Sequence, residues 1–222
     1  MSDRDRVAAG QAVYTPLTLR AYDWFVLGLS NHLLWRCSTS KLLALYERNV
    51  SGVHLDVGVG TGYFLDRARW PVTDPDITLV DLNANSLRFA AGRIARFLPS
   101  TVVANALAPL PVEQRFRSAG LCYLLHCLPG PMSEKAPAVF DNVAAALVDG
   151  ATLFGATIVQ GDAPRSRPAQ WLMNFYNDKG VFSNRDDTIE DLRGALEQRF
   201  SDVRVHSYGA VATFEATRRP VA

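Results

Sequence analysis

Cysteine is scarce in this chain, with three residues among 222. Cys37, Cys122 and Cys127 form no CxxC pair and have no neighbouring cluster of histidine and cysteine. A disulfide framework needs an even set of cysteines, and a structural zinc site needs ligands paired at short spacing. The cysteine content therefore argues against both and favours a reducing compartment.

The sequence also lacks a surplus of either charge and a long apolar run. Its 23 basic and 22 acidic side chains leave a formal net charge of +1. Nucleic-acid binders and proteins of anionic membrane surfaces carry a basic surplus, so we expect neither partner. The most apolar early stretch, residues 24–35, is shorter than the roughly 20 residues that cross a bilayer. The charged first ten residues lack a signal-peptide core, which predicts a cytoplasmic protein.

The chain does contain a regular alternation of short apolar segments and segments with helical spacing. The predicted strands are residues 53–57, 77–80, 101–104, 121–125, 152–159, 203–208 and 211–216. The predicted helices around them are residues 39–48, 63–69, 86–97, 132–147, 168–177 and 188–198. This order predicts an α/β protein with a doubly wound, seven-stranded, mostly parallel sheet that ends in a C-terminal antiparallel strand.

Residues 17–36 are also helical by pattern and precede the first predicted strand. We therefore expect residues 1–50 to form an N-terminal helical lid or substrate cap. Residues 51–222 would then form the main domain.

The strongest local signal is HLDVGVGTG, residues 54–62, where an apolar strand runs into three glycines at alternate positions. Glycine suits a turn in which a ligand presses on the backbone or φ is positive. Asp56 and Asp81 close the first two strands, which predicts two carboxylates at one edge of the sheet. The GxGxG spacing, with Tyr63 next, departs from the GxGxxG of nicotinamide and flavin nucleotides. A carboxylate at Asp56 repels a pyrophosphate and attracts an ammonium group, so the pattern favours S-adenosylmethionine.

With these residues the chain resembles the class I S-adenosylmethionine-dependent methyltransferases, over roughly residues 51–217. The resemblance is strongest at LDVGVGTG, LVDLNANSL and YLLHCLPG. It implies a Rossmann-like sheet, S-adenosylmethionine as the cofactor and S-adenosylhomocysteine as the product. The glycine loop would hold the methionine end, Asp81 the ribose, and Leu82 the adenine. The residues implied at the cofactor are Tyr14 and Tyr22 of the lid, Asp56, Gly58, Gly60, Thr61, Gly62, Asp81, Leu82, Asn105 and Ala106.

Two departures from family patterns narrow the reaction. The acidic residue that many members have at the start of the fourth strand is missing from FRSAG, residues 116–120, so no metal is expected. The NPPY signature of amide and base amino methylation is also missing. The segment LHCLP, residues 125–129, resembles the LHHLP-like segment of small-molecule methyltransferases. His126 is either a base or substrate-orienting group, since imidazole titrates near neutral pH, or a packed structural residue. Tyr123 either lies near the reacting methyl group or is a core aromatic.

We therefore expect an enzyme that moves a methyl group to oxygen, nitrogen or carbon of a small apolar or aromatic acceptor. It would act as a monomer or homodimer. Trp171, Asn174 and Phe175 share one helix face and either line the acceptor pocket or pack on the sheet. An alternative keeps the cofactor site but drops methyl transfer, giving an S-adenosylmethionine-binding protein with other chemistry or none.

Overall fold

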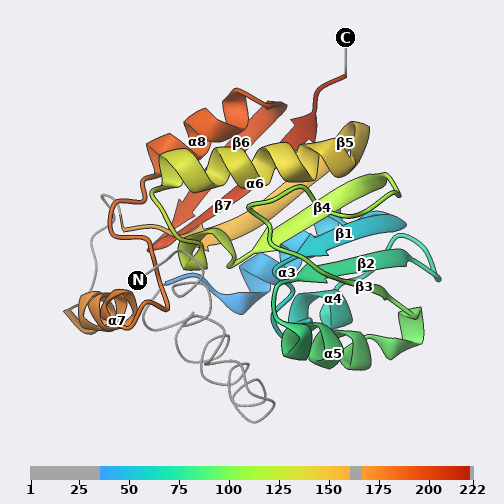
Figure 1. Cartoon of the computed structure of the whole chain (residues 1–222), viewed down its shortest axis with the longest axis horizontal. Helices are drawn as coiled ribbons and strands as arrows, with labels where there is room; N and C mark the ends of the chain where they lie inside the picture. Colours follow the sequence, from blue (N-terminus) through green and yellow to red (C-terminus); the bar gives the residue numbers. More distant parts are fainter. Residues whose placement is uncertain (1–35, 161–166, 221–222) are drawn as a thin grey trace.

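The computed structural model describes residues 36–160 and 167–220, and these build one seven-stranded sheet (Figure 1). The strand order is β3-β2-β1-β4-β5-β7-β6. The strands are β1 (Val53–Val57), β2 (Asp76–Asp81), β3 (Ser100–Val103), β4 (Phe116–Cys122), β5 (Leu147–Ile158), β6 (Phe200–Tyr208) and β7 (Val211–Arg218). The pairs along β3-β2-β1-β4-β5 are parallel, and β7 is antiparallel to both β5 and β6. The predicted doubly wound, mostly parallel sheet is confirmed.

Helices cover both faces of the sheet (Figure 1). One face carries α3 (Thr39–Asn49), α4 (Tyr63–Arg67) and α5 (Ala84–Arg93), and the other carries α6 (Met132–Ala146) and α8 (Ile189–Glu197). The helix α7 (Arg167–Asp178) stands to one side of these layers, and two short 3-10 helices, η2 (Ala95–Phe97) and η3 (Leu125–Cys127), lie in connections. A largely parallel sheet needs this double cover because both of its faces are apolar.

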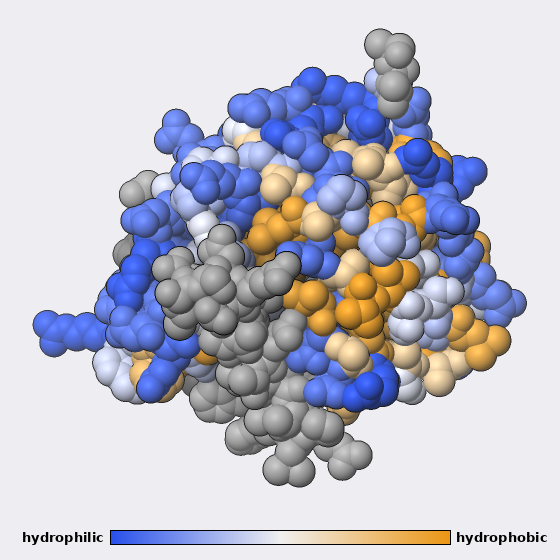
Figure 2. Space-filling view, in the orientation of Figure 1, coloured by the Kyte–Doolittle hydropathy of each residue, from blue (hydrophilic) through white to orange (hydrophobic). Residues whose placement is uncertain are grey.

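The buried apolar side chains accordingly form two clusters, one on each face of the sheet. Phe140 of α6 and Leu192 of α8 belong to the first cluster, and Leu45 of α3 belongs to the second. Neighbours in β5 divide between them, since Leu153 joins the first cluster and Phe154 the second. This is the two-residue period of a strand that is buried on both faces. Figure 2 shows apolar residues gathered over the middle of the visible face, with hydrophilic residues around them.

The bounds of the central strands differ from those predicted. The strand predicted at 121–125 is β4, which runs from Phe116 to Cys122. Tyr123 has a φ of +62° and ends it, and η3 follows. The strand predicted at 152–159 is β5, which already begins at Leu147, directly after α6. The prediction followed the apolar run LCYLL and left out the residues FRSAG before it, because serine and glycine carry little strand preference.

The predicted lid falls largely outside the described residues, which begin at Arg36. Within the described part, α3 buries Leu42 and Leu45 in the same core as the sheet. Among the helices of residues 36–160 and 167–220, none is both long and apolar enough to cross a membrane.

Candidate active site

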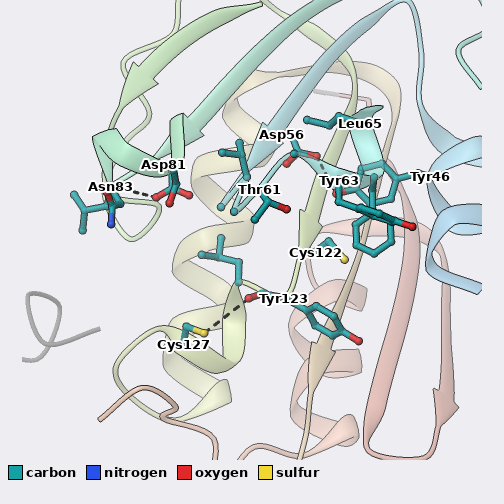
Figure 3. Close-up of a pocket in the computed structure, with 18 of the residues that line it drawn as sticks. Tyr46, Asp56, Thr61, Tyr63, Leu65, Asp81, Asn83, Cys122, Tyr123 and Cys127 are labelled. Carbon is teal, nitrogen blue, oxygen red and sulfur yellow. Dashed lines mark hydrogen bonds between the residues drawn. The ribbon is translucent and has the colours of Figure 1, made fainter. Parts of the chain in front are cut away.

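A pocket opens where the loops that follow β1, β2 and β4 meet (Figure 3). In a doubly wound sheet, the crevice at the carboxyl ends of these strands is where ligands bind. Helix α3 and the segment after α7 complete the wall. The lining residues are Tyr46, Asp56, Gly58, Val59, Gly60, Thr61, Gly62, Tyr63, Phe64, Leu65, Asp81, Leu82, Asn83, Ser86, Cys122, Tyr123, Leu124, Cys127 and Val181.

The glycine loop has a backbone that other residues would strain. Gly58 and Gly62 have φ values of +75° and +69°. A Cβ on Gly58 would lie 2.8 Å from Leu124 Cδ1, and one on Gly62 would lie 3.0 Å from Ala90 Cβ. These two glycines therefore let the loop pack at once against the loop after β4 and against α5.

Asp56 lies near the end of β1 with 2% of its surface exposed. The hydroxyl of Tyr46, on α3, donates to Asp56 Oδ2 at 3.0 Å, and His54 Nε2 lies 3.5 Å from the same oxygen. Burial and the charge of Asp56 raise the pKa of Tyr46 well above its ordinary value, so the phenol stays a donor. The sequence does not single out Tyr46, because this residue looks like any core aromatic of an amphipathic helix.

Asp81 closes β2, and its Oδ1 accepts the backbone N–H of Asn83 at 2.8 Å (Figure 3). Burial raises the pKa of Asp81 to about 6, although backbone N–H groups of Asn83 and the glycine loop lower it. The nearby charge of Asp56 adds to the rise. The structure therefore brings the two predicted carboxylates to one pocket.

The charged side chains of the pocket lining are all of one sign. Its lining contains Asp56 and Asp81, and no lysine, arginine or histidine among the residues that the structure describes. Such a lining attracts a cation and repels a pyrophosphate. Leu82, beside Asp81, adds an apolar contact. The residues present thus fit a ligand with a cationic group, a sugar diol and an apolar ring.

Tyr123 lines the pocket directly after β4 with its φ of +62°, a region uncommon for bulky residues. Its N–H donates to the carbonyl oxygen of Ala156 in β5 at 2.7 Å, which anchors this conformation. Burial raises the pKa of Cys122 well above its ordinary value and that of Cys127 to about 12. Both sulfurs are therefore neutral thiols, unsuited to act as nucleophiles.

His126 does not line the pocket. Its buried ring packs edge-on against Phe182 at 4.6 Å and Tyr123 at 5.7 Å between centroids. The backbone N–H of Ile158 points to His126 Nδ1 at 3.4 Å. Burial, and then the charge of Lys135, lower its pKa to about 3. This geometry favours the structural role over the base, and a base role stays a prediction.

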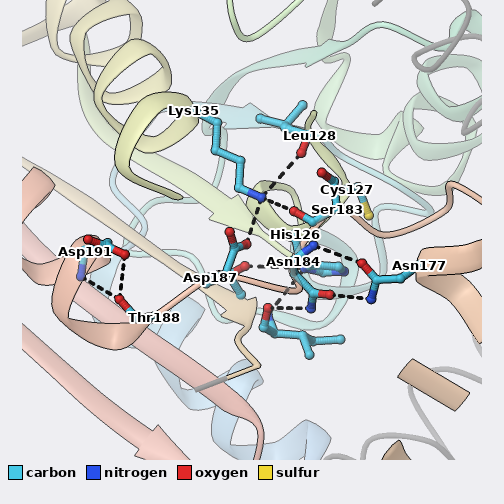
Figure 4. Close-up of polar contacts among 12 residues, drawn as sticks. His126, Cys127, Leu128, Lys135, Asn177, Ser183, Asn184, Asp187, Thr188 and Asp191 are labelled. Atoms are coloured by element: carbon cyan, nitrogen blue, oxygen red, sulfur yellow. Dashed lines mark hydrogen bonds and ion pairs between the residues drawn. The ribbon is translucent and has the colours of Figure 1, made fainter. Parts of the chain in front are cut away.

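A buried ion pair lies behind this part of the wall (Figure 4). Lys135 Nζ of α6 lies 2.8 Å from Asp187 Oδ2, with side chains 0% and 1% exposed. Lys135 also donates to the carbonyl oxygens of Leu128 and Ser183. Burial lowers the pKa of Lys135 and raises that of Asp187 to about 6, while each charge opposes the shift of the other. These contacts hold the segment after α7 in place, and this segment contributes Val181 to the pocket wall.

Two predicted cofactor residues, Asn105 and Ala106, do not line the pocket, and two others lie outside the described residues. Asn105 Oδ1 accepts the N–H of Leu107 at 3.0 Å, and Ala106 is buried in the core, so neither lines the pocket. Tyr14 and Tyr22 lie outside the described residues. Contacts of these four residues with a cofactor stay predictions. In the described part of the chain, no group of three or more histidine, cysteine, aspartate or glutamate residues is placed to hold a metal ion.

Comparison with curated proteins finds relatives along nearly the whole chain. Demethylluteothin O-methyltransferase of Streptomyces thioluteus is 43% identical over 212 residues, which cover 95% of this chain and 92% of that protein. The chain belongs to the class I small-molecule methyltransferases. A second methyltransferase relative, the physcion biosynthesis cluster O-methyltransferase of Aspergillus chevalieri, is 36% identical over 94% of this chain and 95% of its own length. No protein-family model matches the chain.

The methyltransferase fold is also seen in solved structures. Phosphoethanolamine N-methyltransferase 2 of Haemonchus contortus, solved with phosphomonomethylethanolamine and S-adenosylhomocysteine, matches with a TM-score of 0.70. The match covers 100% of the chain described here and 61% of the Haemonchus contortus chain, at 16% sequence identity. At this identity the likeness shows the fold alone.

Proposed function

We propose that the protein is an S-adenosylmethionine-dependent O-methyltransferase that acts on a small apolar or aromatic metabolite. The observation that carries the proposal is the pair of carboxylates, Asp56 and Asp81, beside a glycine loop in a pocket without a described cationic side chain. The relatives named as O-methyltransferases, at 43% and 36% identity, support it and favour oxygen as the acceptor atom.

In this proposal each part of the cofactor has its own residues. Asp56 faces the ammonium group of the methionine part, and residues 58–62 enclose that part with their backbone. Asp81 accepts hydrogen bonds from the two ribose hydroxyls, and Leu82 packs beside the adenine. The contact between Asp81 and the Asn83 N–H fixes the carboxylate before the ribose arrives.

The acceptor would approach the side of the pocket formed by the loop after β4. The bound sulfonium supplies an electrophilic methyl group, and its in-line transfer depends mainly on orientation. Tyr123, Leu124 and Val181 give this side an aromatic and apolar wall. His126 supports the wall from behind through its contact with Tyr123.

Helix α7 carries a further apolar surface, formed by residues that are not part of the pocket lining. Trp171 and Phe175 are 66% and 41% exposed, and their rings stack at 5.7 Å between centroids. Their exposure does not fit packing on the sheet, and neither residue lines the pocket, so a role of this helix face at the acceptor stays a prediction. The N–H of Val181 donates to the carbonyl oxygen of Tyr176, which ties the pocket segment to α7. This arrangement suits an apolar or aromatic acceptor.

The test is calorimetric titration of the protein with S-adenosylmethionine, S-adenosylhomocysteine and NAD. We expect binding of the two sulfur ligands and not of NAD. Asp81→Ala should weaken S-adenosylmethionine by roughly 1–3 kcal/mol, or about 5- to 150-fold, because it removes a charge-assisted hydrogen-bond acceptor. Asp76→Ala, at the exposed opposite end of β2, is the matched control and should leave affinity unchanged.

A folded wild-type protein that binds neither sulfur ligand would overturn the cofactor assignment. Unchanged affinity in Asp81→Ala would overturn the ribose site. Formation of S-adenosylhomocysteine with aromatic hydroxyl acceptors separates methyl transfer from the alternative of a binding protein without transfer, since only transfer generates this product.

A further inference from the structure

Among the described residues, the side-chain donors that reach the carboxylate of Asp56 meet it at one oxygen, Oδ2. Tyr46 donates to Oδ2 at 3.0 Å, and His54 Nε2 lies 3.5 Å from Oδ2. A Cβ on Gly120, in the neighbouring strand β4, would lie 2.7 Å from this same oxygen. All three approaches therefore meet at Oδ2, and the missing side chain of Gly120 provides the space for it.

The ring of His54 is held in place by its own partners. Its Nδ1 lies 2.8 Å from the Oγ of Ser118, which in turn accepts the backbone N–H of Ser51 at 2.9 Å. The ring is buried, stacks on Phe154 at 5.8 Å, and meets Trp70 edge-on at 5.5 Å between centroids. With Nδ1 accepting from the Ser118 hydroxyl, Nε2 carries the hydrogen and can donate to Asp56.

The ring of Tyr46, like that of His54, packs against two aromatic rings. It stacks on Phe64 at 5.1 Å and meets Phe154 edge-on at 5.0 Å between centroids. Its hydroxyl lies in the pocket wall beside Asp56 (Figure 3). Helix α3 and strand β1 thus present two donors, each on a fixed ring, to one carboxylate oxygen.

We propose that Tyr46 and His54 are positioning residues that fix Asp56 through Oδ2 and turn its other oxygen toward the ammonium group of the cofactor. The inference rests on the proposed function. Its consequence is selective, since only ligands that carry the amino acid end depend on the orientation of Asp56. The two residues thereby set a preference for S-adenosylmethionine and S-adenosylhomocysteine over the bare nucleoside thioether.

The first test compares S-adenosylhomocysteine with 5′-methylthioadenosine, which has the same nucleoside but no amino acid. Tyr46→Phe keeps both ring contacts and removes only the hydroxyl. It should weaken S-adenosylhomocysteine by about tenfold and change 5′-methylthioadenosine by less than about twofold. Tyr208→Phe is the matched control, since Tyr208 lies outside the pocket with its ring against Lys41, and should change neither affinity.

Variants of His54 test the second donor independently. His54→Leu should lower the ratio of the affinity for S-adenosylhomocysteine to the affinity for 5′-methylthioadenosine. His54→Gln should keep most of this ratio, because its amide can donate to Asp56. A double-mutant cycle completes the test: in an Asp56→Ala background, which has no acceptor for the hydroxyl, Tyr46→Phe should no longer change the ratio.

Equal weakening of both ligands by Tyr46→Phe, or an unchanged ratio in a folded variant, would overturn this inference and leave the proposed function standing. Wild-type protein that binds neither ligand would overturn the proposed function itself, and the inference with it. Thermal unfolding of each variant shows that the folded state is the one being titrated.

Discussion

Asp81 combines burial with the need to carry a charge. Its pKa is raised to about 6, so it is mostly ionised at neutral pH and takes up a proton as the pH falls through that value. A carboxylate only accepts hydrogen bonds, whereas a protonated carboxyl gains one O–H donor and can no longer accept with both oxygens from the two ribose hydroxyls. Ligand affinity is therefore linked to pH through this residue.

We expect the affinity for S-adenosylhomocysteine to change little between about pH 8 and pH 7, and to fall progressively as the pH is lowered through the pKa of Asp81, about 6, to about 5.5. Calorimetric titration across this range measures it. The profile of Asp81→Asn should be flat over the same range, because the amide does not titrate. A wild-type profile that stays constant below pH 6 would show that Asp81 does not hold the ribose.

At the residue scale, the sequence predicted the residues that stand in recognisable motifs at the ends of the first two strands. Asp56, the glycines and Asp81 were found because strand, loop and acid follow one another in the chain, and the structure brings them to one pocket. Tyr46 was missed because its partner is ten residues away on another element. The placement of His126 depends on where β4 ends, which the local sequence does not decide.

At the scale of elements, the glycine loop can pack closely because its glycines carry no Cβ. Gly58→Ala would place a Cβ 2.8 Å from Leu124 Cδ1 on a backbone with φ of +75°. We expect it to lower affinity for S-adenosylmethionine by at least about tenfold and to destabilise the fold by about 1–3 kcal/mol. Calorimetry and chemical denaturation measure the two effects.

Gly92→Ala is the matched control for this substitution. Gly92 lies within helix α5, and a Cβ there would meet nothing within 4 Å. The change should leave affinity unaltered and stabilise the protein by about 0.5–1 kcal/mol, because alanine suits a helix better than glycine. Equal behaviour of the two variants would contradict the close-packing account of the loop.

The existence and type of most elements could also be predicted, but several of their bounds could not. The apolar runs marked the strands, whereas the start of β4 contains Ser118 and Gly120. Those two positions are decided by contacts across the fold, since Ser118 bonds His54 and Gly120 leaves room for Asp56. A local pattern does not record such contacts.

At the scale of the whole molecule, the buried pair of Lys135 and Asp187 joins α6 to the segment between α7 and α8 (Figure 4). Lys135→Met leaves Asp187 buried without its partner and should cost about 3–5 kcal/mol of unfolding free energy. Chemical denaturation measures the loss. The double variant Lys135→Met/Asp187→Leu removes both charges and should recover much of it. A single variant that loses less than about 1 kcal/mol would contradict this role of the pair.

The overall topology followed from the alternation of strands and helices, because a parallel crossover needs a helix and adjacent crossovers are right-handed. The alternation does not predict the long-range ion pair, since Lys135 and Asp187 lie on distant segments and read as ordinary surface charges. The strand order places β7 inside the sheet, with β6 at its edge.

That placement has a consequence for how the molecule is made. β7 lies between β5 and β6 although it follows both in the chain, so these two strands leave the ribosome before the strand that joins them exists. Until residues 211–218 have been synthesised, residues 152–158 of β5 keep an unpaired edge. Open edges of this kind pair readily with other chains. The time needed to synthesise β7 therefore sets how long each nascent chain exposes this edge of β5 to aggregation.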